Sequence, residues 1–310
     1  MHRHDIKANA LKALILPADA VLRRVLFNSQ PPPVARVTAD VGYGPDAGQR
    51  LDIIEPQRDG LRPVLLYFHG GGWISGDKAS HERICRSLAT NGFVTFNVNY
   101  RLAPRHRFPA QAQDVALAID WVRRHAQRYG ADASRVVLAG DSAGAHLASW
   151  YATCLVNPVL RQAAAIDTAL PREALKGLAL FYGVYDLARA RGCRFPFIRL
   201  YLDSLMDGER PASADALDVA SPARHASAGL PPVFLCAGER DGLFPESVAY
   251  AEALRHAGVD LTTLFFSGTQ HPEASHGFLY LHRRACTRLA LDRVGQFLSR
   301  CIDGSREAGA

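Results

Sequence analysis

Val136–Leu147 reads VVLAGDSAGAHL, an apolar run that turns sharply around one serine, Ser142. Aliphatic residues, then Gly-x-Ser-x-Gly, then alanine-rich helix formers predict a strand, a tight turn and a helix. The glycines at positions 140 and 144 suit such a turn, because a Cβ atom has little room where backbone approaches backbone. The turn would expose the Ser142 hydroxyl and leave the backbone N–H of Ala143 free at the helix start. Ser142 is therefore the candidate nucleophile.

The composition is typical of a globular enzyme. The chain has 310 residues, 48% apolar and 21% charged, enough for one large α/β domain. Its 36 basic and 30 acidic residues are scattered, which favours a solvated surface over a nucleic-acid partner. Neither a run of 18 apolar residues nor a leader pattern is present, so we expect a cytoplasmic protein without a membrane partner. The six cysteines show no Cys-x-x-Cys pair and are expected to be free thiols.

Strands that are apolar on both faces alternate with helices from residue 63 onward, which predicts a parallel sheet covered on both sides. Before them, the alternating stretch Val34–Val41 predicts an edge strand, and Leu51–Glu55 a second strand. The other predicted strands are Val64–Phe68, Val94–Asn99, Arg135–Gly140, Leu178–Gly183, Val233–Gly238 and Leu261–Phe266. The predicted helices lie near Lys78–Thr90, Ala110–Tyr129, Ala143–Val156, Glu246–His256 and Phe278–Cys301. The fold class is α/β, with an eight-stranded, mostly parallel sheet.

The interval between the sixth and seventh predicted strands is too long for a simple crossover. We interpret residues 188–225 as a helical insertion that packs with a helical segment at residues 1–30, divided by Pro17, as a cap over the carboxyl edge of the sheet. Residues 1–310 would then form a single domain, with a catalytic core at residues 34–187 and 226–302.

A glycine run follows the first buried strand, in His69-Gly70-Gly71-Gly72-Trp73. Ligands of open α/β sheets bind beyond the carboxyl ends of the strands. Successive glycines leave backbone N–H groups unshielded, and with the N–H of Ala143 they can converge on a developing oxyanion. We therefore expect Gly71, Gly72 and Ala143 to form an oxyanion hole.

A serine hydroxyl needs a base, usually an imidazole steered by a carboxylate. In the order serine, acid, histidine, the base falls after the last strand, where His276 is favoured over His271. Any other of the 12 histidines is expected to be a surface or packing residue. The acid falls after the seventh strand, where Asp241 is preferred to Glu239, with Asp186 after the sixth strand as the competitor. Each of these carboxylates could instead cap a turn.

Four ordered motifs resemble those of the hormone-sensitive-lipase-like esterases, a family with the α/β-hydrolase fold. They are HGGGW at 69–73, GDSAG at 140–144, Asp241 and HGF at 276–278. The segment YRLAP at 100–104 is also similar to one of that family. The resemblance implies hydrolysis of carboxylic esters. Departures from the family pattern at Asn99, Arg105 and Ala145 leave the substrate preference open.

Two alternative functions remain. The HGGGW run together with SGDK at 75–78 is similar to arylformamidases of the same fold, which makes an amide hydrolase of the N-formylkynurenine type the second candidate. The third is a non-catalytic, ligand-binding relative, although such proteins typically lose the nucleophile or the base.

The favoured prediction is a serine hydrolase that cleaves small-molecule esters of short to medium acyl chain through an acyl-enzyme intermediate. No metal or organic cofactor is implied, because the histidines show no ligand spacing. The candidate walls of the substrate pocket are the aromatic residues Trp73, Phe195, Phe197, Tyr201 and Phe278. The sequence leaves the oligomeric state open, with a homodimer as one option.

Overall fold

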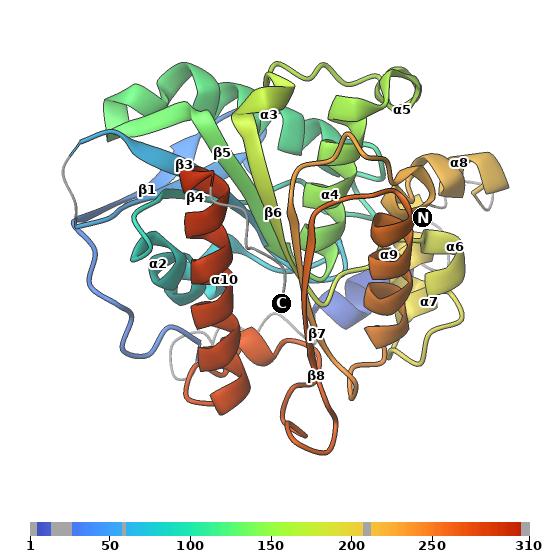
Figure 1. Ribbon diagram of the computed structural model, residues 1–310. Coiled ribbons are helices and arrows are strands. Elements are labelled where there is room, and N and C mark those ends of the chain that lie inside the picture. The colour runs from blue at the N-terminus through green and yellow to red at the C-terminus, as the bar shows by residue number, and fades with distance from the viewer. Residues whose placement is uncertain (1–4, 14–26, 58–59, 207–211, 305–310) are drawn as a thin grey trace.

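A single sheet organises the molecule in the computed structural model, which describes residues 5–13, 27–57, 60–206 and 212–304 (Figure 1). The strands are β1 (Arg36–Gly42), β2 (Arg50–Glu55), β3 (Arg62–Phe68), β4 (Val94–Val98), β5 (Ala131–Asp141), β6 (Leu175–Phe181), β7 (Val233–Gly238) and β8 (Leu261–Phe266). They are ordered β1-β2-β4-β3-β5-β6-β7-β8. β2 is antiparallel to β1 and β4, and the other neighbouring pairs are parallel. The predicted eight-stranded, mostly parallel sheet is confirmed.

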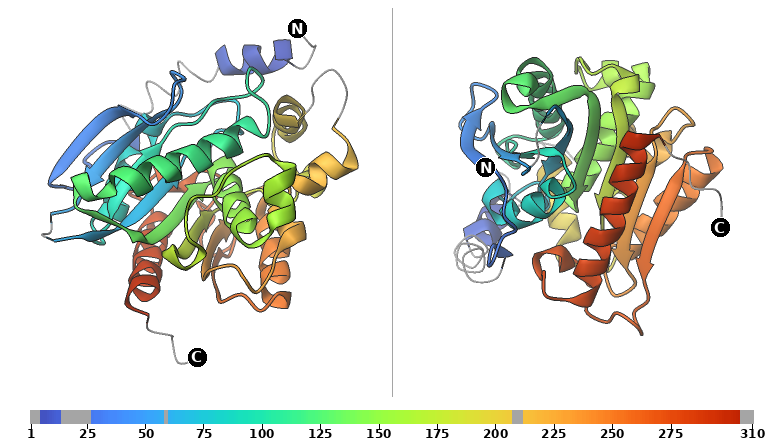
Figure 2. Two further views of the ribbon diagram at one scale, coloured as in Figure 1. Left: turned by 90° about the horizontal axis from the view of Figure 1, so that it is seen from above. Right: turned by 60° about the vertical axis from the view of Figure 1, so that its left-hand side comes forward.

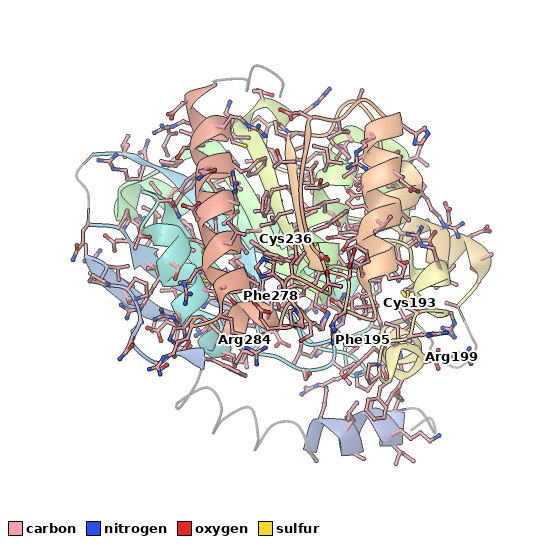
Figure 3. All side chains as sticks on the ribbon, turned by 60° about the horizontal axis from the view of Figure 1, so that its bottom comes forward. Cys193, Phe195, Arg199, Cys236, Phe278 and Arg284 are labelled. Atoms are coloured by element: carbon pink, nitrogen blue, oxygen red, sulfur yellow. The ribbon has the colours of Figure 1, made fainter. Side chains whose placement is uncertain are left out.

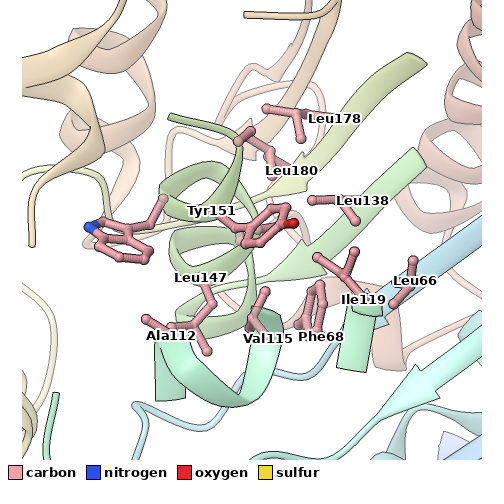
Figure 4. Packing of buried hydrophobic residues seen from close by; sticks show 14 of the residues in the cluster. Leu66, Phe68, Ala112, Val115, Ile119, Leu138, Leu147, Tyr151, Leu178 and Leu180 are labelled. Carbon is pink, nitrogen blue, oxygen red and sulfur yellow. The ribbon is translucent and has the colours of Figure 1, made fainter. Parts of the chain in front are cut away.

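Helices cover both faces of the sheet. The helices that pack on it are α2 (Glu82–Ala89), α3 (Ala110–His125), α4 (Ala143–Val156), α9 (Phe244–His256) and α10 (Ala285–Asp303). α2 and α10 lie side by side on one face, where their apolar residues form a core with β3, β5 and β7 (Figure 1). α3, α4 and α9 cover the other face, and Figure 4 shows Tyr151 and Leu147 of α4 among side chains of the sheet and of α3.

The last predicted helix differs from the observed one. A 3₁₀ turn, η6 (Phe278–Tyr280), is separated from α10 by a short loop. The carbonyl of Phe278 accepts from the N–H of Leu281 at 2.9 Å and from the hydroxyl of Thr287 at 2.8 Å. The first bond closes a tighter turn than an α-helix has, and the second ties the start of α10 back to that turn, so continuous apolar spacing there does not produce one helix.

The long interval between β6 and β7 is helical. It contains α6 (Leu187–Ala190), α7 (Ile198–Met206), α8 (Ala214–Val219) and the 3₁₀ turn η5 (Pro222–His225). A helix at residues 5–13 lies beside α7, where Ala8 is buried against Ile74 and Ala103 (Figure 2). An ion pair of 2.7 Å between Asp5 and Arg107 holds this helix in place. The second N-terminal helix that we expected after Pro17 lies outside the described residues.

None of the helices in these described ranges is long and apolar enough to span a membrane.

Candidate active site

Ser142 occupies the sharp turn between β5 and α4. Its φ of 51° and ψ of −117° are a strained backbone conformation for a residue other than glycine. A Cβ on Gly144 would collide with the carbonyl oxygen of Phe68, and one on Gly140 would lie 2.6 Å from the carbonyl carbon of Gly144. Glycine is therefore required at both positions, as the pattern Gly-x-Ser-x-Gly indicated.

Ser142, His276 and Asp241 form a hydrogen-bonded chain. His276, in the loop after β8, has Nε2 3.0 Å from Oγ of Ser142 and Nδ1 2.7 Å from Oδ2 of Asp241. Asp241 follows β7, and its other oxygen, Oδ1, accepts from the N–H of Leu243 at 2.8 Å. Because a carboxylate only accepts, Nδ1 of His276 is assigned the proton, and Nε2 is left to accept from the serine hydroxyl. This is the geometry that general-base activation of a serine requires.

The competing residues lie elsewhere. His271 pairs with Glu273, at 3.3 Å from Nδ1 to Oε1. Glu239 accepts from a backbone N–H in the loop after β8, at 2.7 Å. Asp186 pairs with Arg224, at 3.0 Å from carboxylate to guanidinium. The competing histidine and both competing carboxylates thus have local partners.

Among the described residues, no three His, Cys, Asp or Glu side chains are grouped as a metal ion needs.

The glycine run after β3 forms a tight loop beside Ser142. Gly71 and Gly72 have φ of 120° and 61°, and the carbonyl of Gly71 accepts from the N–H and the hydroxyl of Ser75 at 3.0 and 2.8 Å. Within the described part of the chain, no group accepts a hydrogen bond from the N–H of Gly71, Gly72 or Ala143. These three donors remain available for a ligand. Ala143 is buried, and a buried backbone N–H group is seldom left without an acceptor.

A cavity of about 240 Å³ opens onto Ser142 and His276. It is lined by Gly71, Gly72, Trp73, Ser75, Asp141, Ser142, Val184, Phe195, Ile198, Tyr201, Leu243, His276, Gly277 and Tyr280. Trp73, Phe195 and Tyr201, three of the expected pocket residues, are among them. The ring of Phe195 lies 4.5 Å from that of His276, centroid to centroid.

Phe197 and Phe278, the other two expected pocket residues, do not line this cavity. Phe197 precedes α7 and is 60% exposed. Phe278 is 1% exposed and packs against Tyr182 and Phe266, with ring centroids 5.2 and 5.5 Å away. Figure 3 shows Phe195 and Phe278 on two separate segments of the chain. Sequence position alone cannot tell a pocket wall from a core residue here.

His146 is a buried polar residue whose contacts the sequence did not reveal. Its Nδ1 accepts from Nε1 of Trp73 at 3.1 Å, and its Nε2 donates to the carbonyl of Ala220 at 2.8 Å. Burial lowers the pKa of His146 to about 4, so the ring is neutral at physiological pH. It lies one helical turn after Ser142, a spacing that could have indicated a place near the site.

Asp141, the residue before Ser142, ties the sheet to the glycine loop. It is 2% exposed, and its Oδ1 accepts from the N–H of Gly70 at 2.9 Å and from the hydroxyl of Tyr67 at 3.0 Å. Burial alone would raise the pKa of Asp141, but the charge of His81 and hydrogen bonds from His81 and Tyr67 hold it below its usual value. Asp141 is therefore an ionised, buried carboxylate next to the nucleophile.

A serine at the carboxyl edge of a mostly parallel sheet, hydrogen-bonded to a histidine and through it to a carboxylate from later loops, is the arrangement typical of an α/β hydrolase. Residues 65–275 match the α/β hydrolase fold family, and the chain belongs to that family. This match, together with the relatives below, confirms the resemblance to the hormone-sensitive-lipase-like esterases.

Several similar proteins are named as esterases. Esterase LipQ of Mycobacterium tuberculosis is 32% identical over 275 residues, which cover 85% of this chain and 62% of LipQ. Carboxylesterase NlhH of the same organism is 31% identical over 244 residues, covering 72% of this chain and 68% of NlhH. The crystal structure of esterase B from Lactobacillus rhamnosis is similar over 96% of both chains, with a TM-score of 0.84 and 25% identity. This chain spans less than two thirds of the length of LipQ.

Proposed function

We propose that this chain is a carboxylesterase that hydrolyses small-molecule esters through an acyl-enzyme on Ser142. The observation that carries the proposal is the hydrogen-bonded chain from Asp241 through His276 to Ser142 at the cavity, with links of 2.7 and 3.0 Å. The names of LipQ and NlhH support the ester as the substrate class.

The mechanism follows from the hydrogen bonds. Oγ of Ser142 attacks the ester carbonyl carbon while Nε2 of His276 takes the hydroxyl proton, and Asp241 stabilises the imidazolium through Nδ1. The carbonyl oxygen becomes an oxyanion, for which the N–H groups of Gly71, Gly72 and Ala143 are the proposed donors. The tetrahedral intermediate collapses, and the alcohol leaves with the proton from His276. Water then attacks the acyl-serine by the same path, which releases the acid and restores Ser142.

The cavity supports a small acyl or alcohol group. Its volume of about 240 Å³ lies below the usual range for drug-sized ligands, about 300–1,000 Å³. Apolar side chains of Phe195, Ile198 and Tyr201 line it from the segment between β6 and β7. We therefore propose that this segment, with the N-terminal helix, is a cap on a single hydrolase domain, and that short to medium acyl esters are the substrates.

The test uses p-nitrophenyl acetate and butyrate with the wild type and Ser142→Ala. The variant should lose turnover and labelling by a fluorophosphonate. Ser149→Ala is the matched control. Ser149 is a buried serine of α4, the helix that begins directly after Ser142, and it does not line the cavity. An unchanged rate in Ser142→Ala would contradict the proposal, and a wild type that gives no adduct would indicate a binding protein.

N-Formylkynurenine belongs in the same assay as the competing substrate. The HGGGW run resembles arylformamidases, whereas LipQ and NlhH are named as an esterase and a carboxylesterase. A higher kcat/KM for the formamide than for every ester in the panel would replace the ester assignment.

The proposal also includes a cytoplasmic location and a homodimeric state. Cell fractionation and light scattering of the purified chain test them. A monomer or an exported protein would leave the reaction assignment unaffected.

A further inference from the structure

A buried ion pair lies directly behind Ser142. Nε2 of His81 is 3.0 Å from Oδ1 of Asp141, and the two side chains are 1% and 2% exposed. Asp141 immediately precedes Ser142 and lines the same cavity. The mechanism above assigns no role to His81, which the sequence marked only as one of the surface or packing histidines.

The hydrogen-bond partners of His81 favour two protons on its ring. Nδ1 lies 3.2 Å from the carbonyl oxygen of Asp77, and Nε2 faces both the Asp141 carboxylate and the hydroxyl of Tyr280. The first two oxygens only accept, and the hydroxyl can accept as well, so we assign a proton to each ring nitrogen and treat His81 as a cation. His81 is also the N-cap of α2, where the helix dipole disfavours positive charge. The Asp141 carboxylate is thus what makes the cation stable there.

His81 also reaches the loop that carries His276. Its Nε2 lies 2.7 Å from the hydroxyl of Tyr280, which is four residues after His276 and lines the cavity. The Asp141 oxygen that His81 contacts, Oδ1, also accepts from the N–H of Gly70, the first glycine of the loop before Trp73. One imidazolium therefore connects the loop of the proposed oxyanion donors to the loop of the proposed base.

We propose that His81 is a positioning residue for the reaction: its cation neutralises the Asp141 carboxylate beside Ser142 and holds the two loops in register around the nucleophile. This inference rests on the proposed function, because it concerns the charge that develops when Ser142 attacks an ester. A bare carboxylate in a buried site would oppose the oxyanion, since like charges repel strongly where water is excluded.

The experiment removes the cation and then the anion. In His81→Phe, we expect kcat for p-nitrophenyl butyrate to fall by about 100-fold, comparable to the loss of one oxyanion donor, with KM changed by less than about threefold. Adding Asp141→Asn should restore at least about tenfold of kcat, because it removes the uncompensated charge. Asp141→Asn alone should cost less than His81→Phe. A residue that only fills space would show no such rescue.

His81→Gln is the second variant, because a neutral amide can still donate to Asp141 with less change of packing. Melting temperatures show which proteins fold. Effects of the two substitutions that simply multiply, or loss of folding in both His81 variants, would overturn the proposal. The wild type is assayed in the same series. If it hydrolyses the ester, a negative result for the His81 variants counts against the role of His81 alone; if it does not, the proposed function itself fails.

Arg101 and Asp114 provide the matched control. They form an ion pair of 2.7 Å, in which Asp114 is buried and Arg101 is half-buried, and neither residue lines the cavity. Arg101→Met and Asp114→Asn should lower the melting temperature while kcat shows no rescue in the double variant. A rescue of kcat there as large as that for His81 and Asp141 would show that any buried ion pair has this effect, and it would refute the positioning role.

Discussion

Asp241→Asn should reduce kcat by about 10⁴-fold, although it changes one atom. In the wild type, Oδ1 of Asp241 accepts from the N–H of Leu243 at 2.8 Å, and Oδ2 faces Nδ1 of His276 at 2.7 Å. An asparagine must keep its oxygen toward Leu243, because its NH₂ group cannot accept from an N–H. The amide N–H₂ therefore faces Nδ1 of His276 and donates to it. The imidazole then carries its proton on Nε2, where it cannot accept the proton of Ser142.

The magnitude corresponds to about 5.4 kcal/mol of activation free energy, at 1.36 kcal/mol for each tenfold. The assay is p-nitrophenyl butyrate hydrolysis under saturating substrate, with the melting temperature as the test of folding. Asp186→Asn is the control, because Asp186 pairs with Arg224 away from the cavity; its kcat should stay near the wild-type value. Turnover of Asp241→Asn within tenfold of wild type would refute the tautomer argument and assign the acid elsewhere.

Three further outcomes follow from the buried contacts. Gly144→Ala should lower stability and kcat together, by about 1–3 kcal/mol of unfolding free energy, because its Cβ meets the carbonyl of Phe68; thermal unfolding would show it. Trp73→Phe removes the donor to His146 and should cost about 1–3 kcal/mol in urea unfolding; an unchanged midpoint would contradict the role of that bond. Burial lowers the pKa of His146 to about 4, and burial with the nearby charge of His81 lowers that of His69 to about 4. Between pH 6.5 and 4 these two histidines bind protons in the unfolded chain but not in the folded one. The free energy of unfolding should therefore fall on acidification, on the order of 3 kcal/mol per histidine. A urea midpoint that does not change over this pH range would contradict the prediction.

Much of the fold could be predicted because its signals are local. β7 and β8 have the predicted bounds, Val233–Gly238 and Leu261–Phe266, since each is a short apolar run between turn residues. α10 could not be placed in the same way. The loop before it is set by the bond from Thr287 to the Phe278 carbonyl, nine residues back, and no helical periodicity reports such a contact.

Site residues could be predicted from the sequence where the chemistry restricts the residue type. They could not be predicted where packing decides which side chains lie near Ser142. Ser142 and His276 stand out because their order and motifs are particular to one chemistry. His81 does not, since its partner Asp141 is sixty residues away in the chain and their contact depends on how β3, β5 and α2 pack. Phe197 and Phe195 are only two residues apart, yet one is exposed and the other lines the cavity.

Two histidine–aspartate pairs flank Ser142, and their surroundings give them different tasks. Nε2 of His276 faces a hydroxyl, which can give and take back a proton, and its side chain is 22% exposed. Nε2 of His81 faces a carboxylate and a phenol, and His81 does not line the cavity. With His81 as the proposed cation, the resting site holds two carboxylates and one cation, and in the proposed mechanism attack by Ser142 adds one oxyanion and one imidazolium. The net charge then stays constant through that step, and removing the proposed cation would leave every stage of the reaction with one more uncompensated negative charge.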